Sequence, residues 1–363
     1  MSGHSAHRLE SLDTLRGIAI FMVIGFHASV AFHPAPWLQS IAKLGNQGVQ
    51  LFFLISAITM CMMWRQRADE PQRGTRFYIR RFFRIAPLFW AALVFYQLWW
   101  RFTLQIPTAA DGPSWAQIVV TALFLHGFAP DAINLVVPGG WSIAVEMSFY
   151  AVFPLLAARL SSPSRMLLFA FAAYLLIGVA ATAWIERVYA PDQNFVYYSM
   201  LTQLPIFPLG MYVYATLMGR ERCDIRWFVA VVFAWLTVAF VGKYVFDLNT
   251  RPFFWLQVAL FGALISIVLE RRLHVGLLSL MGTLSYSMYL FHFAIIDVVA
   301  MMAPREWRDG TPMYLSLFAA TLVLTMVAAK ISALSVERWS TGAARAVIAR
   351  LGQRSVEPRL STE

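Results

Sequence analysis

The chain alternates between long apolar runs and short polar or charged segments. A helix needs about 20 mainly apolar residues to cross the roughly 30 Å hydrocarbon core of a bilayer. Apolar runs of about that length recur from Thr14 to Leu334. The pattern predicts an all-α polytopic membrane protein with about ten transmembrane helices. These cover residues 14–32, 46–64, 85–104, 141–158, 166–185, 198–217, 227–245, 252–269, 279–303 and 313–334.

One further apolar run, at residues 115–128, is short and is bounded by Pro113 and Pro130. If it crossed the membrane, the basic loops near residues 219–226 and 270–274 would lie on the outer side. We therefore interpret it as one re-entrant or interfacial helix on the outer side, shielded from lipid by protein.

The segment between the second and third runs sets the orientation. It contains seven arginines, Arg65, Arg67, Arg73, Arg76, Arg80, Arg81 and Arg84. Short loops rich in Lys and Arg stay in the cytoplasm, so this segment is expected there. With ten spans, both termini are then cytoplasmic. We predict one transmembrane domain over residues 1–339 and a basic cytoplasmic tail over residues 340–363.

Composition supports a membrane protein and argues against a nucleic-acid partner. Of the 363 residues, 59% are hydrophobic and only 13% are charged, about half the charged fraction of a soluble domain. The net charge of +10 arises from 29 Lys and Arg against 19 Asp and Glu. In a membrane protein such an excess reflects basic cytoplasmic loops that face anionic lipid. The two cysteines, Cys61 and Cys223, lie in different settings and predict no metal site.

Two histidines are expected at a similar depth in the membrane. His27 follows Arg16 by eleven residues, about 16 Å along a helix, so it lies near the midplane if Arg16 lies at one face. His292 is placed about as deep in the ninth span. A lone intramembrane histidine can simply pack, but two at one depth favour a site that handles protons. Three residues near His292 could line a polar path to it, Tyr286, Ser287 and Tyr289.

Glu146 and Trp141 lie near the outer end of the fourth span. A carboxylate there needs a partner or water. Glu146 is either a structural partner of an Arg or Tyr on another helix, a ligand for acceptor hydroxyls, or a residue that orients a catalytic histidine. Trp141 is either an interfacial anchor or a platform that stacks on a sugar ring.

Arg81 and Arg84 share one helical face at the cytoplasmic entry to the third span, on the same side as Arg16. Such clusters often do no more than set topology. Three converging guanidiniums would also bind phosphate, because Arg offers planar, forked donors to phosphate oxygens.

Five segments in this order resemble the acyltransferase-3 family of integral-membrane O-acyltransferases. They are LDTLRGIAIFMVIGFH with Arg16 and His27, GVQLFFLISA from Gly48, RFFRIAP with Arg81 and Arg84, WSIAVEMSFY from Trp141, and LSYSMYLFH ending at His292. Gln50 stands where the family often has an acidic residue, which puts a role for that carboxylate in doubt. The hydrolase-like domain fused to some members is also missing, so a second transfer step would need a separate protein.

The resemblance implies transfer of an acyl group, commonly acetyl, from cytoplasmic acyl-CoA to a hydroxyl in the bacterial inner membrane. The acceptor is expected to be a surface polysaccharide, an exopolysaccharide or a lipid-linked sugar. The arginines would bind the phosphates of CoA, and His27 would act as base or acyl carrier. His292 and Glu146 are also expected to be catalytic. The residues expected to bind substrate are Trp141, Tyr286, Ser287 and Tyr289.

Two other functions fit part of the pattern. A proton-coupled secondary transporter also needs ionisable groups at the midplane, but the sequence shows neither internal repeats nor paired broken helices. An acyltransferase acting on a small molecule such as a macrolide would use the same donor site. We expect no metal, and the oligomeric state stays open.

Overall fold

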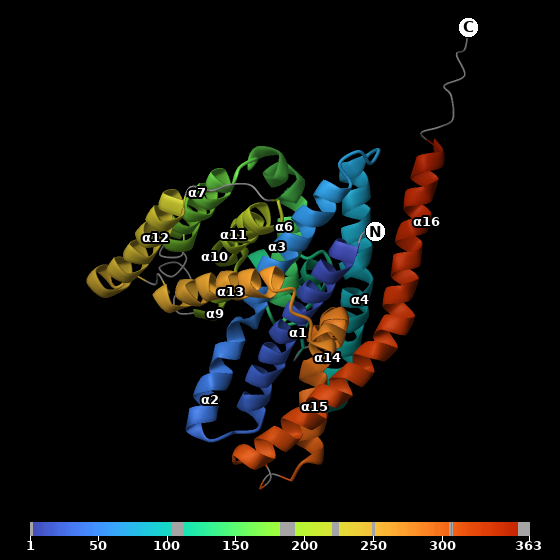
Figure 1. Cartoon of the computed structure of the whole chain (residues 1–363). Helices are drawn as coiled ribbons and strands as arrows, with labels where there is room; N and C mark the ends of the chain where they lie inside the picture. Colours follow the sequence, from blue (N-terminus) through green and yellow to red (C-terminus); the bar gives the residue numbers. More distant parts are fainter. Residues whose placement is uncertain are drawn as a thin grey trace.

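A computed structural model describes residues 3–103, 112–181, 193–219, 225–248, 251–304, 306 and 308–354. All regular structure in these ranges is helical, which confirms the predicted all-α class (Figure 1). The elements are α1 (Gly3–Ala31), α2 (Pro36–Lys43), η1 (Leu44–Gln47), α3 (Gly48–Gln66), α4 (Arg73–Thr103), α5 (Trp115–Ala122), η2 (His126–Phe128), α6 (Gly140–Arg159), α7 (Pro163–Ala173), η3 (Tyr174–Ala181), α9 (Gln193–Tyr198), α10 (Met200–Gln203), α11 (Ile206–Val213), η4 (Tyr214–Met218), α12 (Ile225–Phe246), α13 (Pro252–Glu270), α14 (Gly276–Met302), α15 (Thr311–Ser332), η6 (Ala333–Glu337) and α16 (Arg338–Arg354).

Eight continuous helices within the described ranges are long and apolar enough to cross a membrane. They are Glu10–Ala31, Pro36–Gln66, Arg73–Arg101, Gly140–Arg159, Val229–Phe246, Pro252–Glu270, Ser285–Met302 and Thr311–Gly352. The chain is therefore a multi-pass membrane protein.

The two other predicted spans are interrupted. In the span at 166–185, α7 passes into the π-helical segment η3. The span at 198–217 is divided among α10, α11 and η4, because Pro205 and Pro208 cannot donate a backbone hydrogen bond. Residue 104 and residues 182–185 of the predicted spans lie outside the described residues.

The run at 115–128 forms the short helix α5 and the 3₁₀ turn η2. Eight residues of α-helix extend about 12 Å, too short to cross a bilayer. The helix starts at a capping box, in which the Ser114 hydroxyl accepts a hydrogen bond from the Gln117 amide.

Helix α1 packs closely along α14. The close approach is possible because, where the helices cross, a glycine of each helix faces the backbone of the other. A Cβ atom on Gly17 would lie 1.9 Å from the Leu278 carbonyl oxygen, and one on Gly282 would lie 1.8 Å from that of Asp13. Gly48 has the same effect between α1 and α3, where a Cβ atom would lie 2.7 Å from the carbonyl oxygen of Ala19. Small residues at these positions thus permit close contact between helices.

Two helices extend beyond their predicted limits. Helix α4 begins at Arg73, so the arginines of residues 73–84 lie on helical turns ahead of the predicted start at residue 85. Helix α15 continues through the π-helical segment η6 into α16, which stands beside α4 (Figure 1). Residues 340–354 of the predicted tail are therefore helical, and residues 355–363 lie outside the described residues.

Candidate active site

A cavity of about 850 Å³ lies among α1, α3, α4, α6, α14 and α16. This volume is within the range of about 300–1,000 Å³ that is common for small-molecule sites. Its lining follows α3 from Val49 to Met63, or about 21 Å at 1.5 Å per residue. The cavity therefore extends over most of the thickness of a bilayer core.

Arginines collect at one end of this cavity. Among the described residues that line it are Arg16, Arg67, Arg80, Arg81, Arg84 and Arg345. Arg16 is within electrostatic range of Arg81 and Arg84, so the three predicted phosphate ligands converge at this end.

Three of the arginines are held by carboxylates. The ion-pair distances are 2.7 Å for Arg16–Asp13, 2.5 Å for Arg80–Glu70 and 2.6 Å for Arg84–Glu337. Arg16 also donates to Thr59 Oγ1 at 2.7 Å. Hydrogen bonds from Arg80 lower the pKa of Glu70, in the loop before α4, and so favour its charged form.

Arg81 is held differently. Its guanidinium contacts Met63 Sδ at 2.8 Å and lies 5.9 Å from the Phe77 ring and 5.4 Å from the Tyr150 ring. Within the described part of the chain, no carboxylate lies within ion-pair distance of Arg81. Aromatic and sulfur contacts orient the cation without neutralising it, so its charge remains available to an anion.

Glu146 lies on the same cavity, deeper than the arginines. Its carboxylate accepts hydrogen bonds from the Ser56 hydroxyl at 2.6 Å and from the Tyr150 hydroxyl. Ser56 is on α3, whereas Tyr150 follows Glu146 by four residues on α6. The observed partners are thus a serine on a neighbouring helix and a tyrosine on its own helix.

Tyr289 lines the cavity at the end farthest from the arginines. Its hydroxyl donates to the Gly139 carbonyl oxygen and accepts from the Ser142 hydroxyl, both at 2.9 Å. Gly139 has a φ of +74°, and a Cβ atom there would lie 2.9 Å from the Tyr289 hydroxyl. Glycine therefore permits both the left-handed turn before α6 and the close approach of Tyr289.

The two predicted histidines lie together beyond Tyr289. The ring centroids of His27 and His292 are 5.2 Å apart, so the two rings are in contact. The ring of His292 is 5.6 Å from that of Tyr289. Neither histidine is among the described residues that line the cavity.

A single hydrogen bond fixes the tautomer of His292. Its Nδ1 lies 2.7 Å from the Tyr289 carbonyl oxygen, which can only accept, so Nδ1 carries the proton. Nε2 then has a free lone pair, and this buried atom has no hydrogen-bond partner among the residues that the structure describes. His27 is only partly buried. The histidine pair can therefore accept a proton at Nε2 of His292, which carries none.

The predicted substrate-binding residues separate into two groups. Tyr286 and Tyr289 line the cavity, and the Tyr286 hydroxyl donates to the Ile85 carbonyl oxygen at 2.7 Å. Ser287 is fully buried away from the cavity and donates to Glu337. Trp141 is 4% exposed and stacks on Tyr198 with 4.8 Å between ring centroids. In this structure its ring is packed in the interior.

Sequence reasoning missed several residues that line the cavity. They are Asp13, Ser56, Thr59, Ser142, Tyr150 and Arg345. The spacing of Ser142, Glu146 and Tyr150 at every fourth position was an available signal, because such residues share one helical face. Gln50 is fully buried and donates to Gln203 Oε1 at 3.1 Å, which is a packing role.

Comparison with known proteins gives one family match over most of the chain. The family model described as an acyltransferase domain matches residues 9–330. No solved structure matched the chain.

Named relatives also cover most of the chain. BcsY of Komagataeibacter xylinus, named as a membrane-bound transacylase, is 28% identical over 92% of this chain and 83% of its own. The peptidoglycan O-acetyltransferase OatA of Listeria monocytogenes is 24% identical over 84% of this chain and 53% of its own. The exopolysaccharide production protein ExoZ of Rhizobium meliloti is 28% identical over 90% of this chain and 99% of its own.

Proposed function

The chain belongs to the acyltransferase-3 family, and from this premise we propose that it moves an acyl group from cytoplasmic acyl-CoA to a hydroxyl of a glycan. Acetyl is the proposed group and the bacterial inner membrane the proposed location. The names of OatA and ExoZ support a glycan acceptor, since one contains peptidoglycan and the other exopolysaccharide.

One observation carries the proposal: a single cavity joins an arginine-rich end to a carboxylate and hydroxyls near a histidine pair. CoA is a polyanion with a long, flexible arm that ends in the thioester. Arg16, Arg81 and Arg84 bind its phosphates by charge-assisted hydrogen bonds. From the level of Thr59, which Arg16 contacts, the pantetheine arm extends about 15 Å along α3 to Val49, which brings the thioester toward Tyr289.

The histidine pair supplies the base. In direct transfer, an imidazole nitrogen takes the proton of the acceptor hydroxyl while the hydroxyl oxygen attacks the thioester carbonyl. The C–O bond forms, the C–S bond breaks, and the CoA thiolate leaves and takes up the proton. In the covalent route, an imidazole nitrogen of His27 attacks the thioester carbonyl first, so that a C–N bond forms, the C–S bond breaks and the CoA thiolate leaves. The acceptor hydroxyl then attacks the acyl-imidazole, the C–N bond breaks, and the hydroxyl proton passes to an imidazole nitrogen and on to the thiolate. Both routes require Tyr289 to move, because its side chain lies between the cavity and His292.

Glu146 acts within the cavity in either route. Its hydrogen bonds with Ser56 and Tyr150 hold the carboxylate in place. From there it orients the acceptor hydroxyl or stabilises the imidazolium that forms during proton transfer. Tyr286 and Tyr289, with their hydroxyls anchored to backbone carbonyls, shape the channel along which the thioester travels.

The test is mass spectrometry of surface glycans from a deletion strain, with the wild-type gene restored as control. Loss of one acyl ester, regained on complementation, supports the proposal and identifies the acyl group. Unchanged acylation contradicts it. A radiolabelled acyl group trapped on purified protein without acceptor would indicate the covalent route, and its absence during rapid turnover would favour direct transfer.

A further inference from the structure

Helix α16 forms one wall of the cavity, although the family match ends at residue 330. Its cavity-lining residues recur at intervals of three and one, which places them on one helical face. They are Thr341, Ala344, Arg345, Ile348 and Ala349. The sequence pattern alone predicted only a basic tail for this segment.

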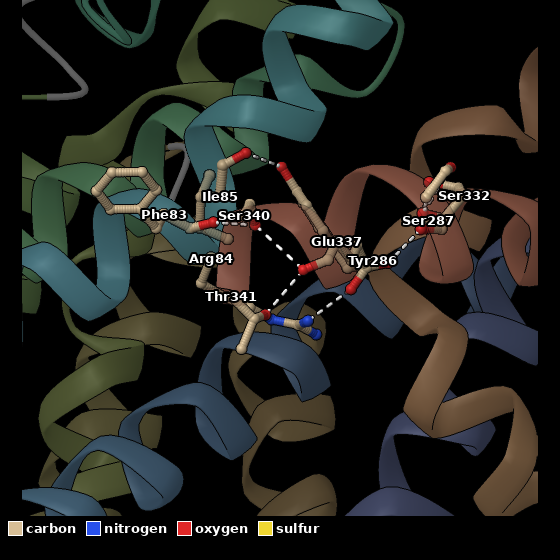
Figure 2. Close-up of polar contacts among 10 residues, drawn as sticks. Phe83, Arg84, Ile85, Tyr286, Ser287, Ser332, Glu337, Ser340 and Thr341 are labelled. Atoms are coloured by element: carbon tan, nitrogen blue, oxygen red, sulfur yellow. Dashed lines mark hydrogen bonds and ion pairs between the residues drawn. The ribbon is translucent and has the colours of Figure 1, made fainter. Parts of the chain in front are cut away.

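A proline in α4 creates the attachment point for α16. Pro87 has no N–H, so the carbonyl oxygen of Phe83, four residues earlier, has no partner within its own helix. Ser340 supplies the missing donor, with its hydroxyl 2.7 Å from that oxygen (Figure 2).

Glu337 provides a second attachment. This residue ends the π-helical segment η6, and its side chain is 12% exposed. Its carboxylate accepts hydrogen bonds from Arg84 on α4, at 2.6 Å, and from Ser287 on α14 (Figure 2). A π-helical turn shifts the register of the residues that follow it, so η6 determines which face of α16 meets the cavity.

This placement leaves Arg345 as an available cation at the arginine end. Asp13, Glu70 and Glu337 pair with Arg16, Arg80 and Arg84, respectively. Over the described ranges, by contrast, Arg345 has no carboxylate within ion-pair distance. Its side chain is exposed and lines the cavity.

We propose that Arg345 binds a phosphate group of the acyl-CoA donor and that Ser340 and Glu337 position α16 for this contact. The inference rests on the proposed function, because it takes the donor to be a CoA thioester. Arg350 is the matched control, since it is an exposed arginine on the same helix that does not line the cavity.

The experiment is calorimetric titration of CoA into the full-length protein in nanodiscs of zwitterionic phosphatidylcholine. This lipid removes anionic headgroups, the other source of a ligand for Arg345. We expect Arg345→Ala to weaken CoA binding about tenfold, the loss typical of one charge-assisted hydrogen bond. Arg350→Ala should leave the Kd unchanged, and thermal melting should show that both variants are folded.

The outcomes separate this inference from the proposed function. If the wild-type protein binds CoA and Arg345→Ala binds it equally well, α16 holds no donor ligand and the inference is wrong, while the proposed donor stands. Equal losses in the two variants would also overturn it, because the effect would then follow overall charge. If the wild-type protein binds no CoA, the proposed donor and this inference fail together.

Discussion

Helix α3 borders two cavities that differ in how their polar groups are used. The second cavity, of about 340 Å³, lies among α3, α7, α11, α12 and α13 and is mostly apolar. Two of its hydroxyls bond within their own helical segments: Thr216 donates to the Tyr212 carbonyl oxygen at 3.0 Å and Ser266 to that of Gly262 at 2.8 Å.

The arginine-lined cavity adds hydrogen bonds between side chains of different helices. Ser56 on α3 reaches Glu146 on α6, and Arg16 on α1 reaches Thr59 on α3. Such bonds fix polar side chains that a ligand can contact, whereas a hydroxyl that donates to a carbonyl oxygen of its own helix is already satisfied by the backbone. Enclosed volume alone therefore does not identify a site; the direction of its polar contacts does.

The largest difference in transfer activity is expected between a variant of the histidine pair, which lies beside the arginine-lined cavity, and a variant of the apolar cavity. His27→Ala should reduce transfer by at least about 100-fold, because it removes the base or acyl carrier. Thr216→Val in the apolar cavity should leave transfer unchanged. Turnover of labelled acyl-CoA by purified protein measures both. Full activity of a folded His27→Ala protein would refute the assignment.

Arg81→Ala should act next most strongly, on the donor alone. Loss of a cation that faces an anionic ligand should raise the KM for acyl-CoA by about tenfold or more. The KM for the acceptor should stay the same. Initial rates over a matrix of donor and acceptor concentrations separate the two constants, and an unchanged dependence on donor would contradict the role of this residue.

Trp235→Ala should have the reverse profile. Trp235 is 5% exposed, lines the apolar cavity and stacks on Tyr174 at 4.9 Å. Its removal leaves a void, so the melting temperature of the purified protein should fall, while the KM for acyl-CoA stays constant in the folded fraction. A specific rise in that KM would show that the two cavities are coupled.

The smallest expected effect concerns Glu70, at the edge of the arginine-lined cavity. Because Arg80 lowers its pKa, the contribution of Glu70 to stability is complete above the pKa of the unfolded state and is lost as pH falls through the lower, folded-state value. Glu70→Gln should therefore melt slightly below wild type at pH 7, and the difference should vanish in acid. A difference that is independent of pH would exclude the ion pair as its cause.

Much of the fold follows from the periodicity of the apolar runs, because a bilayer imposes a minimum length on each helix. The interruptions near Tyr174 and Pro205 are not predicted by the sequence. Composition alone does not show where neighbouring helices supply hydrogen-bond partners to backbone groups that a helix interruption leaves unpaired. Residues 340–363 read as a tail because they are basic and polar, a composition that does not reveal a helix packed beside a cavity. The contact that places α16 is the hydrogen bond from the Ser340 hydroxyl to the Phe83 carbonyl oxygen on α4.

For the candidate site, the charged residues were predictable and the arrangement of their neighbours was not. An arginine or histidine in an apolar run is costly, so Arg16 and His27 stand out in the sequence. The position of Trp141 is not distinctive in this way. A tryptophan near the end of an apolar run has the same sequence pattern whether it lies at the membrane interface or stacks on Tyr198, as it does here. Only the packing of helices far apart in sequence distinguishes the two.

The hydrogen bonds of Tyr289 with Gly139 and Ser142 also bear on the integrity of the membrane. The arginine-lined cavity follows about 21 Å of α3, and an open path of that kind through a bilayer would conduct ions and discharge the proton gradient. The two hydrogen bonds hold one aromatic side chain at the end of the cavity farthest from the arginines. On the proposed function, this side chain would keep the path closed between turnovers, so that an acyl group could cross while protons are retained.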